Sequence, residues 1–129
     1  MAVKVPVSWG ELFDKITILQ IKSEKITDAA KKQNVDRELA ELLAVVDEAG
    51  PQGGEVKALM ASLRETNERL WDIEDDIRCC EREKRFDEEF IGLARSVYVT
   101  NDRRADLKKQ INTLLDSALV EEKSYESYT

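Results

Sequence analysis

Histidine is absent from the 129-residue chain, and cysteine is limited to the adjacent pair Cys79 and Cys80. Imidazole is the usual general base and a common metal ligand, so chemistry that depends on it is excluded. Adjacent residues on a helix project about 100° apart, which rarely suits a disulfide, and two thiols cannot complete a structural zinc site. The chain also has no phosphate-binding glycine loop and no nucleophile elbow. We therefore expect no catalytic residue, metal or cofactor, and the sequence favours a non-enzymatic role.

Glycine and proline are scarce, with 5 and 2 residues, whereas 36% of the residues are charged and 42% are hydrophobic. This composition is typical of long amphipathic helices that expose one face to solvent. The length fits one domain with a modest core. We expect a single domain over residues 1–129, with an extended lead-in at 1–7 and a polar tail at 119–129.

A concentrated positive surface is missing as well. The net charge is −7, and residues 1–50, 51–86 and 87–129 are each net negative. Double-stranded nucleic acid and anionic membranes attract proteins through clustered basic residues, so both are poor partners for this chain. The sequence shows no signal peptide and no apolar run as long as a membrane span. We expect a protein of the reducing cytoplasm.

The clearest pattern is an apolar seam between Glu55 and Lys84, in which side chains recur at alternating spacings of three and four. This heptad spacing is typical of coiled-coil-like helix packing. The seam consists of Val56, Leu59, Leu63, Thr66, Leu70, Ile73, Ile77 and Cys80. A second seam, in phase from Phe86 to Ala118, predicts another long helix, although a break at Thr100–Asn101 is an alternative.

Capping residues set the other boundaries. Ser8 followed by Glu11 forms a capping box, and Asn34, Asp87 and the Gly50–Pro51 stop mark further helix ends. The fold class that follows is all-α, an antiparallel helical bundle. Two shorter helices are expected at about 9–27 and 35–49, and two long helices at about 55–84 and 88–117. The connection at about 28–34 between the two shorter helices has room for helical turns of its own. Gly10, in the first turn of the first helix, is expected to allow a close approach of another element.

Beside the first seam lies a polar stripe on one helix face, formed by Asn67, Trp71, Glu74 and Arg78. One interpretation is a solvated flank with a surface ion pair between Glu74 and Arg78. The other is the edge of a ligand groove, in which Trp71 is a wall and Asn67 and Arg78 are donors. The stripe alone does not decide between them.

The stretch from Arg95 to Lys109 is basic, and it includes Arg104 at a seam position, where an unpaired charge is costly. Arg104 should therefore meet a carboxylate from another helix or a bound anion. The carboxylates closest to other seams are Asp14, Glu74 and Asp75. Asp14 and its neighbour Lys15 are themselves expected on the rim of the first helix.

Several short segments of the sequence together resemble a family of small bacterial proteins that is catalogued as domain of unknown function 6165. These segments are Val5-Pro6-Val7-Ser8-Trp9-Gly10-Glu11-Leu12, Asp14-Lys15-Ile16-Thr17-Ile18-Leu19, Asn67-Glu68, Leu70-Trp71, Ile73-Glu74-Asp75, Ile77-Arg78, Phe90-Ile91, Leu93-Ala94-Arg95-Ser96-Val97-Tyr98, Asn101-Asp102 and Glu121-Glu122-Lys123-Ser124-Tyr125. The resemblance covers nearly the whole chain. It implies a stand-alone, all-helical cytoplasmic protein without an established activity.

Two functions remain after these exclusions. The first is a module that self-associates or docks a partner. The two long helices are longer than the two short ones, so part of their apolar seam has no partner within the chain, and a second copy in a homodimer could cover it. The alternative is an anion-binding protein or small enzyme that acts on a phosphate-, sugar-nucleotide- or carboxylate-containing small molecule. The candidate ligand-binding residues are Asn67, Trp71, Glu74, Arg78, Arg95, Tyr98 and Arg104.

Overall fold

A computed structural model describes residues 1–51, 53–119 and 121–129. Gln52 in the expected turn and Val120 in the expected tail lie outside the described residues. The helices are α1 (Trp9–Lys25), α2 (Ala29–Ala49), α3 (Gly54–Arg82) and α4 (Glu88–Leu114), and no strand occurs in the described ranges. The predicted all-α helical bundle is confirmed. None of the helices drawn from these residues combines the length and apolar character needed to cross a membrane.

Most helix ends follow from the capping chemistry of the sequence. The Ser8 hydroxyl accepts a hydrogen bond from the Glu11 backbone N–H at 3.1 Å, so α1 begins as predicted. Asp87 accepts from the Phe90 backbone N–H at 3.2 Å, which starts α4 and lowers the pKa of the Asp87 carboxyl. Gly50 ends α2 in the left-handed conformation, with φ of 73°. The helix α4 runs through Thr100 without a break.

The predicted start of the second helix at residue 35 is wrong, since α2 begins at Ala29. Asp28, not Asn34, is the cap, and its carboxylate accepts from the Lys31 backbone N–H at 2.9 Å. The first turns of α2 are polar and exposed, so they carry no apolar periodicity that would reveal them. An ion pair between Lys32 Nζ and Asp36 Oδ2, 2.9 Å apart, stabilises these turns instead. The other predicted ends coincide with the observed ones or differ from them by at most three residues.

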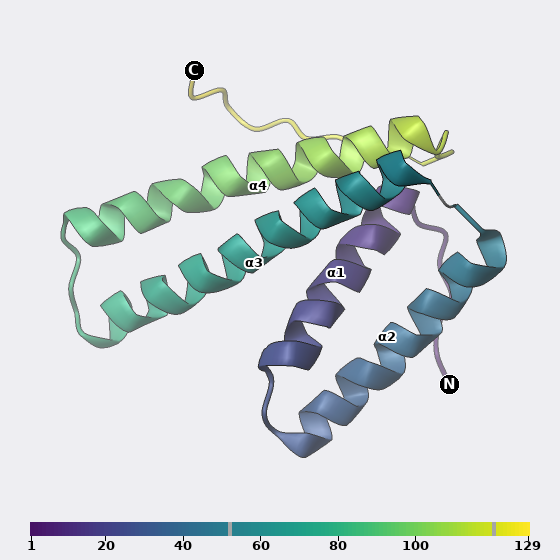
Figure 1. Cartoon of the computed structure of the whole chain (residues 1–129). Coiled ribbons are helices and arrows are strands. Elements are labelled where there is room, and N and C mark those ends of the chain that lie inside the picture. The colour runs from purple at the N-terminus through teal and green to yellow at the C-terminus, as the bar shows by residue number, and fades with distance from the viewer. Residues whose placement is uncertain (52, 120) are drawn as a thin grey trace.

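The helices form two hairpins that meet at an angle, with α1 and α2 in one and α3 and α4 in the other (Figure 1). The helix α1 contacts all three other helices, whereas the backbone of α2 approaches that of α1 alone. The long α3–α4 hairpin extends well beyond α1 at the end where α3 joins α4 (Figure 1). We call this part the outer half of the hairpin, and the part against α1 the inner half.

The core lies where α1 crosses the inner half. Its buried members come from α1, α3 and α4, and they are Leu12, Phe13, Ile16, Val56, Leu63, Leu107 and Ile111. The helix α2 has no buried residue and adds partly buried side chains such as Leu39 and Leu42 to this cluster. Burial is less continuous in the outer half: Ile73 and Cys80 are 6% and 1% exposed there, whereas Ile77 and Val97 are only half-buried.

Candidate functional site

The most buried carboxylate among the described residues is Asp14 on α1, which is 2% exposed. Arg104 of α4 donates to both of its oxygens, from Nε to Oδ1 at 2.8 Å and from Nη2 to Oδ2 at 2.5 Å. Asn67 of α3 donates from Nδ2 to Asp14 Oδ1 at 3.0 Å and to Thr17 Oγ1 at 2.9 Å. This group of four residues, the Asp14 network, joins α1, α3 and α4 by hydrogen bonds between buried and partly buried polar groups.

The network confirms that Arg104 meets a carboxylate from another helix, and the partner is one of the three that the sequence offered. The hydrogen bonds to Asp14 raise the pKa of the Arg104 guanidinium. The expected rim position of Asp14 is wrong. Because α1 contacts α2, α3 and α4, a wide arc of its surface is covered, and Asp14 lies inside that arc. Lys15 is exposed and pairs with Glu38 of α2 at 2.8 Å.

A second buried charge lies one turn along α4. The ammonium group of Lys108 is 2.8 Å from a Glu11 carboxylate oxygen and 2.7 Å from one of Glu121, and the Lys108 side chain is 8% exposed. Burial lowers the pKa of this ammonium, but the hydrogen bonds to the two glutamates outweigh that effect, so the pKa lies above its ordinary value. Glu121 thereby attaches the C-terminal segment to the bundle.

A cavity of about 280 Å³ opens beside the Asp14 network. Its lining combines one residue of α1, one of α4 and a stripe of α3, namely Ile18, Asn67, Leu70, Trp71, Glu74, Asp75 and Arg104. Four of the predicted ligand-binding residues therefore lie together: Asn67, Trp71, Glu74 and Arg104. Two of these four, Asn67 and Arg104, already donate to Asp14.

The remaining three predicted residues lie elsewhere. Arg78 is on the surface, with its Nε 3.6 Å from a Glu74 carboxylate oxygen, as expected for a solvated flank. Tyr98 packs against Tyr128 of the C-terminal segment, with ring centroids 5.2 Å apart. Arg95 lines a different cavity, between α3 and α4. The predicted set is thus divided over separate surfaces.

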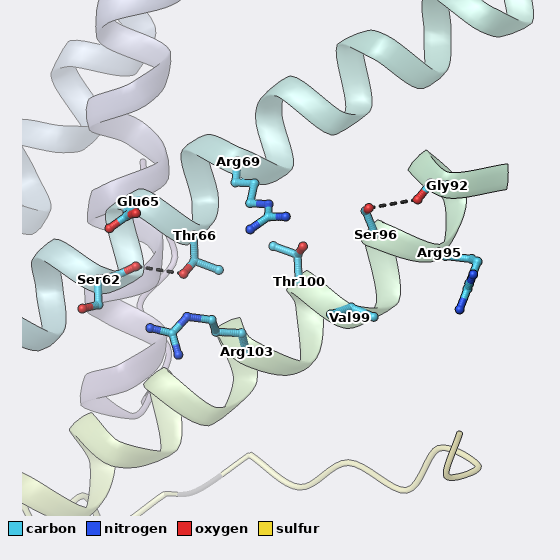
Figure 2. A pocket seen from close by; sticks show the side chains of 10 residues that line it. All are labelled: Ser62, Glu65, Thr66, Arg69, Gly92, Arg95, Ser96, Val99, Thr100 and Arg103. Carbon is cyan, nitrogen blue, oxygen red and sulfur yellow. Dashed lines mark hydrogen bonds between the residues drawn. The ribbon is translucent and has the colours of Figure 1, made fainter. Parts of the chain in front are cut away.

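A separate groove of about 420 Å³ lies between α3 and α4. We call it the arginine groove, and it is lined by Ser62, Glu65, Thr66, Arg69, Gly92, Arg95, Ser96, Val99, Thr100 and Arg103. Figure 2 shows Arg69 of α3 and Arg103 of α4 reaching toward the space between the two helices. Arg95 lies at the outer end and is turned away from the groove (Figure 2).

The arginine groove lies on the side of the hairpin opposite α1. Asn67 contacts α1, and residues two positions apart on a helix project about 200° apart, so Arg69 points away from α1. Thr66 and Ser96 donate their hydroxyls to the carbonyl oxygens of Ser62 and Gly92, each at 2.9 Å (Figure 2). These bonds fix two hydroxyl oxygens on the groove walls.

Of the residues of this groove, sequence reasoning included Arg95 among the candidate ligand-binding residues and Arg103 only as part of the basic stretch from Arg95 to Lys109. Arg69 lies three positions after the seam residue Thr66, and Arg103 lies directly before the seam residue Arg104, so both are close in sequence to positions that the apolar pattern identifies. The missing information was the register of α3 against α4, which places the two arginines opposite each other. No cluster of three or more acidic or cysteine side chains suited to a metal occurs within residues 1–51, 53–119 and 121–129.

Comparisons with known proteins give one match. The sequence profile described as "Family of unknown function (DUF6165)" matches residues 3–129. No curated protein and no solved structure matches the chain. The resemblance of the short sequence segments to this family is thereby confirmed over almost the full length of the chain. The chain belongs to the family of unknown function DUF6165.

Proposed function

We propose that this protein is a helical docking module that pairs with a second copy of itself through the outer half of the α3–α4 hairpin. The observation that carries the proposal is that the apolar seam continues beyond the helix that covers it. The surface concerned, the outer face, comprises Trp71 and Ile77 of α3 and Phe90, Ala94 and Val97 of α4. It lies on the side of the hairpin that α1 covers farther in.

The burial of the outer face supports this proposal. At the inner half, α1 packs over the hairpin and Leu107 and Ile111 are 3% and 0% exposed. On the outer face, Ile77, Phe90 and Val97 are only half-buried, because α3 and α4 have just each other to pack against. Phe90, Ala94 and Val97 recur at spacings of four and three, which matches the contact stripe of a packed helix. A further helix pair would bury this stripe.

The charges beside the outer face fit a second copy. A twofold contact brings the same surface together from both chains, so it must be complementary to itself. Glu74 and Arg78 supply opposite charges next to Trp71, and they make only a loose pair within the chain, at 3.6 Å. In a twofold dimer, Glu74 of each copy can accept from Arg78 of the other. The exposed, small side chain of Ala94 allows a close helix approach.

The test is the oligomeric state of a variant in which Ala94 is replaced by arginine. We expect the wild-type chain at micromolar concentration to show twice the 14.8 kDa mass of one chain in light scattering, and Ala94→Arg to show one chain. The matched control is Ala44→Arg, because Ala44 is exposed on α2 and points away from α1. It should leave the mass unchanged. A wild-type mass equal to one chain would reject the proposal.

A ligand site at the cavity beside Trp71 is the weaker proposal. Its volume of about 280 Å³ lies just below the roughly 300–1,000 Å³ of small-molecule pockets. Asn67 and Arg104, which would supply donors, are directed at Asp14. A thermal-shift screen of sugar phosphates, nucleotides and carboxylates tests it: a shift that Trp71→Ala abolishes is the expected result for a ligand there, and no shift at millimolar ligand would end the proposal.

A further inference from the structure

We infer that the arginine groove binds a small molecule through a phosphate group, held between Arg69 of α3 and Arg103 of α4. This inference concerns the side of the hairpin opposite the outer face and is independent of self-association. It rests on the charge of the groove, on its hydroxyl groups and on its volume.

The first observation is that the arginines of the groove form no ion pair within the described part of the chain, although one carboxylate lines the groove with them. Among the described residues, Arg69, Arg95 and Arg103 form no ion pair, and neither does Glu65, the carboxylate that lines the groove with them. By contrast, Arg64, Arg85 and Arg104 each pair with a carboxylate. In a chain with 27 acidic and 20 basic residues, such a group of free guanidinium groups favours an anion from outside.

The second observation is a hydroxyl group without a partner. Thr100 is 6% exposed, but its hydroxyl oxygen is not itself buried, since no buried side-chain oxygen of the described residues lacks a partner; it makes no hydrogen bond to any described residue, unlike the hydroxyls of Thr66 and Ser96. Thr100 lines the groove between the two arginines (Figure 2). Its hydroxyl is therefore open to the groove, where water or a ligand oxygen can form a hydrogen bond with it.

These donors suit a phosphate better than a carboxylate. A guanidinium group binds phosphate oxygens in a bidentate manner, and a phosphate group offers three oxygens to donors that come from different directions. Here the donors come from two facing helices and from the groove floor between them. With Arg69 and Arg103 against the single Glu65 carboxylate, the groove keeps a net positive charge that attracts the double negative charge of a phosphate monoester at neutral pH.

The volume of the groove, about 420 Å³, exceeds what a phosphate group alone requires. The space toward Gly92 is open, since a Cβ atom added there would meet nothing within 4 Å. The organic part of the ligand can lie along this outer stretch, next to Val99. Arg95 stands at the outer end and would meet a second anionic group only after its side chain turns inward (Figure 2).

The experiment is a backbone amide NMR titration of the intact chain with inorganic phosphate and then with glycerol 3-phosphate. We expect saturable shift changes at millimolar ligand, confined to residues 62–69 and 92–103, and none with potassium chloride at equal ionic strength. Because it uses the wild-type protein, this measurement does not depend on how any variant folds. Absence of saturable changes, or equal changes with chloride, would overturn the inference.

Variants then identify the donors. Arg69→Gln and Arg103→Gln should each weaken glycerol 3-phosphate binding by roughly tenfold or more, which corresponds to about 1.4 kcal/mol. Both arginines are exposed, so neither change should unfold the chain. Arg82→Gln is the control, since Arg82 is an exposed arginine of α3 outside the groove, and it should bind like the wild type. Equal weakening in all three variants would indicate general charge attraction and reject the site.

Two further comparisons separate this inference from its alternatives. Succinate that binds as tightly as glycerol 3-phosphate would overturn the phosphate assignment in favour of carboxylates, including those of an acidic peptide. The Ala94→Arg variant should retain phosphate binding whether or not it dissociates a dimer. Loss of binding in that variant would show that the groove requires the second copy, contrary to the inference.

Discussion

Replacement of Asp14 by alanine is expected to lower the free energy of unfolding by about 3–5 kcal/mol, the usual cost of removing one member of a buried ion pair. The change leaves the Arg104 guanidinium without its bidentate acceptor and the Asn67 amide without one of its two acceptors. The Arg104 side chain is 29% exposed and can move partly into water, which places the loss toward the lower end of that range. Urea denaturation followed by circular dichroism measures it.

Two controls give the Asp14→Ala result its meaning. Lys15→Ala removes the neighbouring, solvent-exposed pair with Glu38 and should cost less than about 1 kcal/mol. The double variant Asp14→Ala with Arg104→Ala should be more stable than the sum of the two single effects predicts, because it leaves no unpaired charge. A loss below about 1 kcal/mol for Asp14→Ala would contradict the assigned role, since buried ion pairs cost more to break.

The Asp14 network also shows how far the sequence alone could go. The position of Arg104 in an apolar seam was sufficient to predict a carboxylate partner, because an isolated charge there is too costly. The same pattern misplaced Asp14, since hydrophobic periodicity assigns polar residues to the outside by default. Which polar residue of α1 faces inward depends on how α1 crosses α3 and α4, and one helix's spacing contains no information about that crossing.

Some helix boundaries were likewise predictable from the sequence, and others were not. Ser8, Asp87 and Gly50 act through local backbone chemistry, so their effects were predictable from neighbouring residues. The first turns of α2 were missed because they have polar, exposed side chains, and Asp28 was not recognised as their cap. Local hydrogen bonds hold these turns without a buried face, so an apolar pattern cannot reveal them.

The candidate sites depended on relations between helices. The sequence placed Asn67, Trp71 and Glu74 on one face correctly, because residues at i, i+4 and i+7 of one helix share a face. It could not place Arg69 opposite Arg103, which lie on different helices. Their meeting requires the register of the α3–α4 hairpin, and this register is set by packing along the whole seam.

Replacement of Gly10 by alanine is expected to destabilise the protein by roughly 1–3 kcal/mol, the usual cost of overpacking a close contact. Helix propensity alone predicts the opposite, since alanine is better than glycine inside a helix by about 1 kcal/mol. An added Cβ atom at Gly10 would lie 2.5 Å from the Lys108 carbonyl oxygen and 2.9 Å from Asn112 Oδ1. The Gly10 backbone N–H also donates to that Asn112 oxygen at 2.7 Å. The backbone of α4 cannot yield as a side-chain end could, so α1 must move away.

The control for Gly10→Ala is Gly92→Ala, which makes the same change in a helix where nothing lies within 4 Å of the new Cβ atom. Propensity should then dominate, and the variant should gain up to about 1 kcal/mol. Urea midpoints of the two variants should therefore shift in opposite directions from the wild type. A gain in both would mean that α1 and α4 are farther apart than the contact at Gly10 requires. In that case the hydrogen bond from Gly10 to Asn112 could not hold the start of α1 against α4.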